Sequence, residues 1–198
     1  EENKWKIEMA NETYKKLGDL EMERLEIVGD ENIWGYRNKM EYSFGEGDGG
    51  ITLSFFERGK KVRRCIEACE LANSEINRVA KLILEWINKH KITMRSLKAM
   101  ILRSNLKNEV IAALFIKDKL EFADFPVLDK NFVGFKLFYS THKSPASVPT
   151  ALLYGVGQDC LTEELLGAKL KYGIFSFFQI FIATFSAYFF SMRQIIKG

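Results

Sequence analysis

The residues of this chain that could perform chemistry are few, with three cysteines and two histidines in 198 residues. Cys65 and Cys69 are four residues apart, a spacing that would place both thiols on one helix face if residues 64–71 were helical. Two sulfurs do not complete a tetrahedral zinc site or a four-cysteine iron–sulfur site. Cys160 has no neighbouring base or cation cluster to activate it, and His90 and His142 have no ligand-spaced partners. The residues alone therefore predict no complete catalytic or metal site.

The distribution of charge along the chain indicates a function more clearly than the cysteine content does. Residues 1–34 hold 5 basic and 10 acidic side chains, residues 35–143 hold 20 and 13, and residues 144–198 hold 4 and 3. The basic excess is densest in Arg58–Arg64, with five cations in seven residues. Such a run is typical of a surface that faces a polyanion, and a solvated loop is the alternative interpretation.

The elements that must position these residues follow from hydrophobic periodicity. A loose helical pattern at 3–17 ends near Gly18, and a strong one at 73–90 has Asn73 or Ser74 placed to cap it. Alternating apolar residues predict a hairpin of 37–44 with 51–55, and two apolar runs on either side of residues 105–108 predict a second hairpin of 97–104 with 109–116. Further strands are predicted at 134–140, 151–154 and 168–175. The fold class is therefore α+β, with a largely antiparallel sheet and one long packing helix.

Composition excludes a collagen, a coiled coil and a disordered linker, because 47% of the residues are hydrophobic and only three are prolines. Three cysteines also favour a reducing, cytoplasmic compartment. Gly155-Val156-Gly157 resembles part of a dinucleotide loop but lacks a third glycine and a following helix, so a tight turn between strands is the better interpretation. Residues 173–192 carry no charge, which leaves a C-terminal membrane anchor as an alternative; Gln179 and several hydroxyl residues count against it.

Four short segments resemble one family. Trp34-Gly35-Tyr36-Arg37-Asn38-Lys39-Met40-Glu41-Tyr42-Ser43-Phe44-Gly45 is similar to the motif that opens the central domain of the RNA 5-methyluridine (uracil-C5) methyltransferases, which act on 23S ribosomal RNA or transfer RNA. Phe56–Gly59, Cys69–Leu71 and Leu170–Gln179 agree in order and spacing. The resemblance covers about residues 3–180.

The resemblance implies S-adenosylmethionine as methyl donor and RNA as partner, with no obligate protein partner. It also implies that the chain is a fragment: the Rossmann-like cofactor domain, with the cysteine nucleophile and the carboxylate base, is absent from it. We therefore expect this chain alone to be inactive, and no residue in it to be catalytic. Cys69 matches the fourth ligand of a 4Fe-4S cluster whose other three ligands would lie outside the chain. Gln179 matches a glutamine that contacts the cofactor region beside the flipped uracil.

The expected domain plan has three parts: an N-terminal helix and linker (1–34), a central RNA-positioning domain (35–172) and an apolar segment leading towards the cofactor domain (173–198). The predicted RNA contacts are seven cations, with Arg37 and Lys39 expected on the solvent face of their strand. They are Arg37, Lys39, Arg58, Lys60, Lys61, Arg63 and Arg64. After Gln179 the similarity ends, since Phe181 stands where the family usually has asparagine, and a frameshifted or truncated reading frame would explain the phenylalanine-rich tail. A non-catalytic RNA-binding module and a tail-anchored membrane protein remain alternative functions.

Overall fold

The computed structural model describes residues 2–18, 27, 33–145, 147–165 and 167–179. The chain divides into two compact units, Glu1–Glu31 with Ala183–Gly198 and Asn32–Ile182. In the first unit the described structure is chiefly helix α1 (Glu2–Gly18), which ends at Gly18 as its sequence predicts. Ion pairs one turn apart stabilise this helix, such as Lys6 with Glu2 at 2.6 Å. Its apolar residues Trp5 and Leu17 are exposed.

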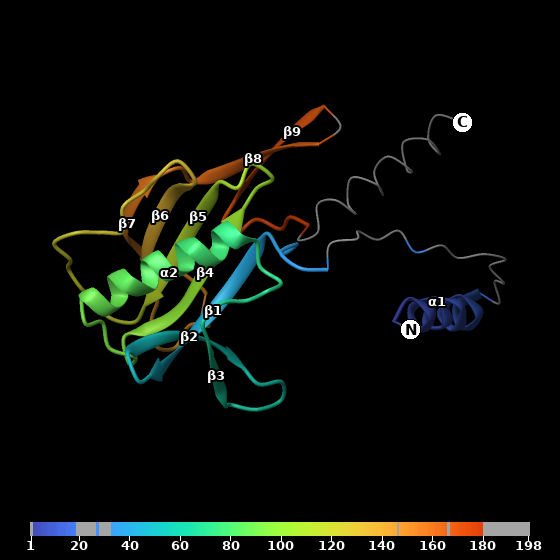
Figure 1. The fold of residues 1–198 in the computed structure, drawn as a ribbon, viewed down its shortest axis with the longest axis horizontal. Helices are drawn as coiled ribbons and strands as arrows, with labels where there is room; N and C mark the ends of the chain where they lie inside the picture. Colours follow the sequence, from blue (N-terminus) through green and yellow to red (C-terminus); the bar gives the residue numbers. More distant parts are fainter. Residues whose placement is uncertain (1, 19–26, 28–32, 146, 166, 180–198) are drawn as a thin grey trace. The chain divides into compact units, whose positions relative to one another are not determined.

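The second unit is built on a seven-stranded sheet with the order β3-β2-β1-β4-β5-β6-β7. Every neighbouring pair is antiparallel except β5 and β6. Figure 1 shows this sheet with helix α2 (Ser74–Lys89) lying along one face. The strands are β1 (Lys39–Gly47), β2 (Gly50–Phe56), β3 (Arg63–Ile66), β4 (Leu97–Ser104), β5 (Val110–Ile116), β6 (Phe132–Tyr139) and β7 (Ala151–Gly157). The predicted α+β class and the largely antiparallel sheet are therefore confirmed.

Helix α2 forms the main core with the sheet. Its buried residues recur at helical spacing, and Asn73 caps its first turn by accepting a hydrogen bond from the Glu75 amide. Two asparagines of α2 also pair with backbone groups of other elements. Asn88 accepts from Ile51 N and donates to Ile51 O, at 2.8 and 2.9 Å. In the same pattern, Asn77 accepts from Cys69 N at 3.1 Å and donates to Cys69 O at 3.0 Å. The helix is thus fastened to the chain by hydrogen bonds as well as by apolar packing.

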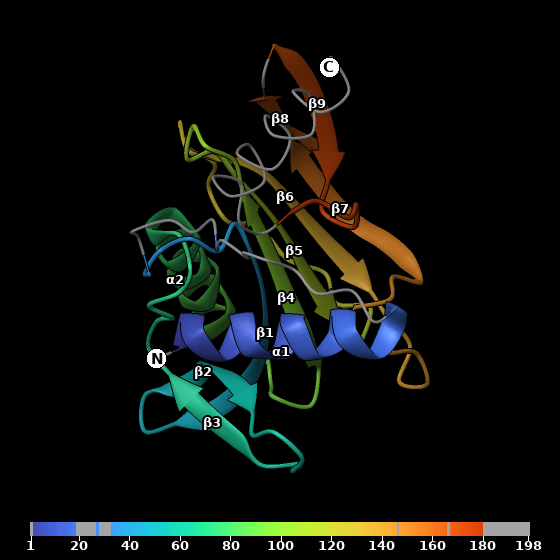
Figure 2. The same ribbon diagram turned by 90° about the vertical axis from the view of Figure 1, so that its right-hand side faces the viewer.

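The opposite face of the sheet carries a second apolar cluster. Hairpin β8 (Cys160–Leu165) and β9 (Ala168–Gly173) contributes Leu161 and Tyr172 to it. The segment that follows β9 packs Phe175 against Phe115, at a centroid distance of 6.1 Å. Figures 1 and 2 show the hairpin extending beyond the end of the seven-stranded sheet.

Several sequence-based expectations need correction. β3 and β8 were not predicted, and the predicted strand at 168–175 ends at Gly173. Gly155 and Val156 lie inside β7 and are not a turn; Gly157, which has a φ of 77°, ends that strand. Cys65 lies in strand β3 and Cys69 in the loop after it, so the two thiols do not share a helix face.

The membrane-anchor alternative concerned residues 173–198, of which 180–198 lie outside the described part of the chain, as does Phe181. Within the described ranges, no helix has the length and apolar character needed to cross a bilayer.

Candidate functional site

Three of the family-like segments meet where the chain enters β1. Gly35 N donates to Glu70 O and Arg37 N donates to Leu71 O, both at 2.8 Å. Arg37 also forms a parallel bridge with Ala72. These bonds lay the start of the Trp34–Gly45 segment beside the Cys69–Leu71 segment. We call residues 35–39, 69–73 and 173–179 the motif junction.

The third segment joins at Asn38. This side chain is 5% exposed, and its Nδ2 donates to the carbonyl of Gln179 at 2.9 Å. Asn38 lies between the two predicted RNA contacts Arg37 and Lys39. The backbone of the predicted cofactor contact, Gln179, is therefore one hydrogen bond away from the residue that separates those two cations in the sequence. Gln179 itself is exposed, as a residue that contacts a ligand or another domain must be.

Arg103 of β4 donates hydrogen bonds to the backbone of the same segment. The residue is fully buried, and its Nη1 donates to Gly173 O at 2.9 Å and to Ser176 O at 2.5 Å. Its Nη2 lies 3.4 Å from Phe178 O. Burial lowers the pKa of the Arg103 guanidinium from its usual value. Neither Arg103 nor Asn38 was among the predicted site residues; their signals in the sequence are an arginine ending the apolar run Ala99–Leu102 and an asparagine inside a family-like motif.

Lys39 faces Arg103 across the β1–β4 pair. Burial lowers the pKa of the Lys39 ammonium, and the neighbouring Arg103 charge lowers it further, with Glu41 acting against both. Arg37 and Lys39 are half-buried, so the expectation that they stand on an open solvent face is only partly met. Arg37 also precedes β1 and does not lie within it. Arg37 and Lys39 are two residues apart at the start of β1, and a pair of cations favours an anion such as a phosphate.

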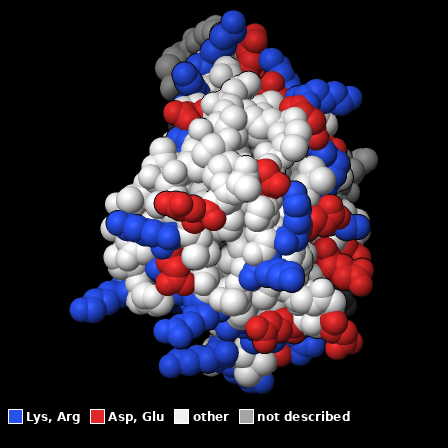
Figure 3. Space-filling model, turned by 90° about the vertical axis from the view of Figure 1, so that its left-hand side faces the viewer, with Lys and Arg blue, Asp and Glu red and all other residues white. Residues whose placement is uncertain are grey.

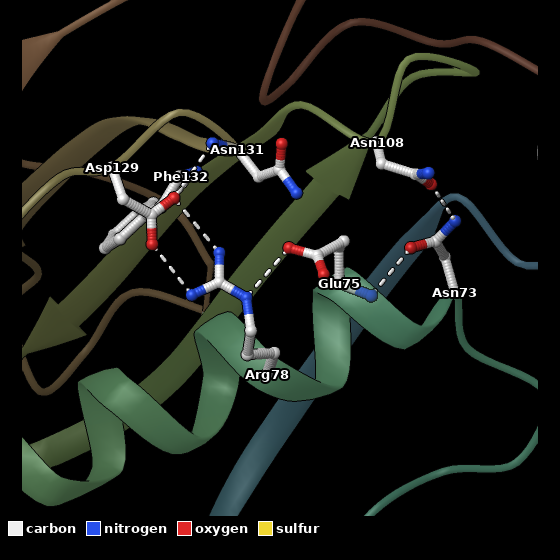
Figure 4. Close-up of polar contacts among 7 residues, drawn as sticks. All are labelled: Asn73, Glu75, Arg78, Asn108, Asp129, Asn131 and Phe132. Atoms are coloured by element: carbon white, nitrogen blue, oxygen red, sulfur yellow. Dashed lines mark hydrogen bonds and ion pairs between the residues drawn. The ribbon is translucent and has the colours of Figure 1, made fainter.

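The motif junction is also tied to the start of α2. Asn73 N donates to Arg37 O at 2.9 Å, and Asn73 Nδ2 donates to Asn108 Oδ1 at 3.0 Å. One turn into the helix, Arg78 forms a two-point ion pair with Asp129 at 2.8 and 3.1 Å (Figure 4). Arg78 Nε also donates to Glu75, at 2.8 Å. This network fixes the end of the helix that supports the backbone of Arg37.

The basic run forms a second group of cations, on the β2–β3 turn and β3. Arg64 and Lys60 pair with Glu57 at 2.7 and 3.3 Å, and these two pairs lower the pKa of the Glu57 carboxyl, the Arg64 hydrogen bond most strongly. The Arg63 guanidinium lies over the Phe56 ring, 5.0 Å from its centroid. Figure 3 shows Lys and Arg side chains extending from the lower end of the molecule, the end at which Figure 1 places β2 and β3. The seven predicted RNA contacts thus fall into two groups, one at the motif junction and one on this turn.

Cys69 meets some requirements of a cluster ligand. It is half-buried, and Asn77 holds its backbone on both sides. However, the chain has three cysteines, one fewer than a Cys₄ cluster needs. Among the described residues, no group of three or more His, Cys, Asp or Glu side chains could hold a metal ion. His90 instead bonds Asp124 Oδ1 through Nε2 at 2.7 Å.

A cavity of about 520 Å³ lies apart from these predicted residues. It is bordered by the loop after β5 and by β6 and β7, and its lining is Lys119, Leu120, Glu121, Phe122, Phe125, Leu137, Leu153 and Tyr154. Phe125 stacks on Tyr154 with a centroid distance of 3.4 Å and an angle of 2°. The lining contains neither a predicted RNA contact nor the predicted cofactor contact.

The fold is that of a solved RNA-modifying enzyme. The Pyrococcus abyssi tRNA (uracil-54, C5)-methyltransferase, solved in complex with S-adenosyl-L-homocysteine, matches with a TM-score of 0.69 at 21% identity. The match covers 91% of this chain and 46% of that chain. At this identity the likeness defines the fold.

Curated proteins of similar sequence are named RNA methyltransferases. The chain is 27% identical over 198 residues to an uncharacterized RNA methyltransferase of Caldanaerobacter subterraneus subsp. tengcongensis, covering 90% of this chain and 44% of the relative. It is 26% identical over 192 residues to one of Clostridium acetobutylicum, covering 85% and 42%. No family model matches the chain. The resemblance to RNA methyltransferases is confirmed by these relatives, and the chain spans less than half of their length.

Proposed function

We propose that this chain is the central, RNA-positioning portion of an S-adenosylmethionine-dependent RNA uracil-C5 methyltransferase. The observation that carries the proposal is the motif junction. The Gln179 carbonyl accepts a hydrogen bond from Asn38, which lies between Arg37 and Lys39 in the sequence, although more than 130 residues separate the two segments. An enzyme that methylates a base must hold the RNA backbone close to the cofactor, because uracil C5 is inaccessible inside a stacked helix. The motif junction supports this arrangement.

The proposed roles follow the two groups of cations. Arg37 and Lys39 hold the phosphates next to the flipped uridine, and the β2–β3 turn holds more distant phosphates of the same ribosomal or transfer RNA. Gln179 fits a cofactor-side contact because its carbonyl is fixed while the residue stays exposed. S-adenosylmethionine supplies the methyl group when bound. The family resemblance implies that a Rossmann-like domain outside this chain supplies the rest of that site.

Cys69 is proposed as one ligand of a 4Fe-4S cluster, completed by three cysteines outside the chain. Its half-buried thiol and fixed backbone support the assignment. We also propose a cytoplasmic location and the three-part plan of 1–34, 35–172 and 173–198. In this plan the chain binds RNA but does not methylate it, since the nucleophile and base belong to the cofactor domain.

Ultraviolet cross-linking tests the RNA role. A uridine-containing RNA stem-loop with 4-thiouridine at the loop is mixed with the 198-residue chain, irradiated, and the cross-linked peptides are identified by mass spectrometry. We expect cross-links in residues 35–39 and 58–64, and fewer as salt is raised. Cross-links confined to other surfaces, or none, would refute the proposed RNA path.

A methyl-transfer assay separates the enzyme portion from a non-catalytic RNA-binding module. Tritiated S-adenosylmethionine and RNA are incubated with the chain alone and with the chain joined to a relative's cofactor domain. Methylation only in the joined form supports the proposal. Binding without methylation in either form favours the module, and methylation by the chain alone would contradict the proposed division of labour.

A further inference from the structure

Arg103 differs from an ordinary buried arginine in the type of group that accepts its hydrogen bonds. Within the described part of the chain no carboxylate pairs with it, and its acceptors there are the backbone carbonyls of Gly173, Ser176 and Phe178. Burying a guanidinium is costly unless hydrogen bonds replace its water. The residue is fully buried, and the carbonyls that replace the water at Nη1 and Nη2 are supplied by one short segment after β9, whereas Nε has no hydrogen-bond partner among the described residues.

Aromatic rings close the remaining side of the guanidinium. Its carbon lies 4.9 Å from the centroid of the Tyr172 ring and 6.0 Å from that of Phe178. The two rings stack on each other with a centroid distance of 4.1 Å and an angle of 12°. A cation held against stacked rings and carbonyls has few alternative positions, so the contact specifies geometry.

The segment is folded so that its carbonyls converge. Ser176 N donates to Gly173 O at 3.3 Å, and Gly173 N donates to Ser176 Oγ at 3.0 Å. This turn aims the Gly173 and Ser176 carbonyls at the same Nη1 of Arg103. The next fixed point along the chain is the Gln179 carbonyl, held by Asn38.

We propose that Arg103 is a positioning residue: it anchors the turn at Gly173–Phe178 and thereby sets the place of Gln179 at the motif junction. The functional meaning rests on the proposed function, in which Gln179 contacts the cofactor. The anchoring itself is a property of this chain. Arg103 touches neither RNA nor cofactor, because it is fully buried.

A purely stabilising role of Arg103 predicts that its substitution speeds amide exchange uniformly across the core. A buried charge without a carboxylate partner carries a desolvation cost, and apolar replacements of buried ionic groups are often neutral or stabilising. Arg103→Met should therefore leave the core as stable as before while releasing the turn. Arg103→Lys keeps the charge and three donors but lacks the fork that reaches several carbonyls at once, so it should restore the turn in part.

Amide hydrogen exchange by NMR tests the anchor on the 198-residue chain. In Arg103→Met we expect the Gly173 and Ser176 amides to exchange about tenfold or more faster, since hydrogen bonds to a charged group are lost. Core amides of α2 should keep their wild-type rates, and Arg103→Lys should give intermediate rates. Arg95→Met, at an exposed arginine shortly before β4, is the matched control and should change neither set.

A second readout isolates positioning from stability. The Asn38 side-chain amide donates to Gln179 O, so its proton shift and its contacts to Gln179 report where that residue lies. We expect both to change in Arg103→Met although Asn38 is untouched, and to return partly in Arg103→Lys. Uniformly faster exchange across the core, or unchanged turn amides and an unchanged Asn38 signal, would overturn the proposal. If Arg103→Met does not fold, the same comparison is made with Arg103→Lys, and wild-type rates and an unchanged Asn38 signal there would also overturn it.

The exchange and cross-linking experiments distinguish a failure of the anchor from a failure of the proposed function. Cross-linking of RNA to residues 35–39 tests the RNA role without reference to the turn. The exchange experiment contains no RNA, so the anchor can fail while the RNA role survives, and the reverse.

Discussion

Glu57 restrains two of the cations that we assign to RNA. Its carboxylate accepts from Arg64 at 2.7 Å and from Lys60 at 3.3 Å. The side chains of the two cations are 75% and 67% exposed, so both could reach a phosphate if they were released. Glu57→Gln keeps the shape of the side chain and removes its charge. We expect this substitution to strengthen RNA binding.

The magnitude follows from counterion release. Each phosphate neutralised on single-stranded RNA steepens the fall of log K with log salt by about 0.7. Releasing two cations should therefore steepen the slope by up to about 1.4. Exposed ion pairs are individually weak, and the release of two of them should raise the affinity at low salt by about twofold to about thirtyfold.

The assay is fluorescence anisotropy of a labelled RNA stem-loop titrated with protein at several salt concentrations. Glu85→Gln is the matched control, because it removes one exposed carboxylate from α2, away from the basic run. We expect the control to keep the wild-type slope. Equal slopes for wild type and Glu57→Gln would show that the β2–β3 turn does not contact RNA and would refute this reasoning.

Three further predictions concern the scaffold, each followed by urea denaturation with tryptophan fluorescence. The hydrogen bond from Arg78 lowers the pKa of Asp129 to about 2 from 3.8. The ionised carboxylate therefore stabilises the fold above pH 4, and this stabilisation is lost as the pH falls towards 2. Because both side chains are about 40% exposed, the stabilisation is only about 1 kcal/mol, and Asp129→Asn should abolish its pH dependence. Asn77→Ala should cost about 2–3 kcal/mol, because the N–H and C=O of Cys69 both lose a partner, whereas wild-type stability would show that water replaces the amide. Gly157→Ala should cost about 3 kcal/mol or more, since its φ is 77° and a Cβ would lie 2.2 Å from a backbone oxygen; a loss below about 1 kcal/mol would mean that the strand shifts easily.

Elements with a strong period were predictable from the sequence. Helix α2 and the hairpins β1–β2 and β4–β5 lie close to their expected bounds. Helix α2 and the β1–β2 hairpin have apolar residues at helical or alternating spacing, whereas β4 and β5 are short apolar runs buried on both faces and separated by a turn sequence. β3 was missed because its four residues include two arginines and a cysteine, with no apolar alternation. It forms by pairing with β2, an interaction that periodicity within β3 cannot reveal.

The site was predictable residue by residue only where a motif marked it. The resemblance identified Arg37, Lys39, Cys69 and Gln179, but it gave no distances between them. Their convergence depends on Asn38 and Arg103, whose partners lie 141 and 70–75 residues away. Such pairings are set by tertiary packing, and no local pattern in the sequence encodes them.

The strand order has a consequence for how the protein is made. Apart from β1 beside β4, every neighbour in the seven-stranded sheet is also a neighbour in sequence, so each strand can add to a growing edge as it leaves the ribosome. The carbonyl partners of Arg103 are synthesised only after the last strand of that sheet. Until then the guanidinium can remain hydrated, and the arrival of Gly173–Phe178 would expel its water in a late step of folding. The biosynthetic order thus lets the sheet form before the charge is desolvated.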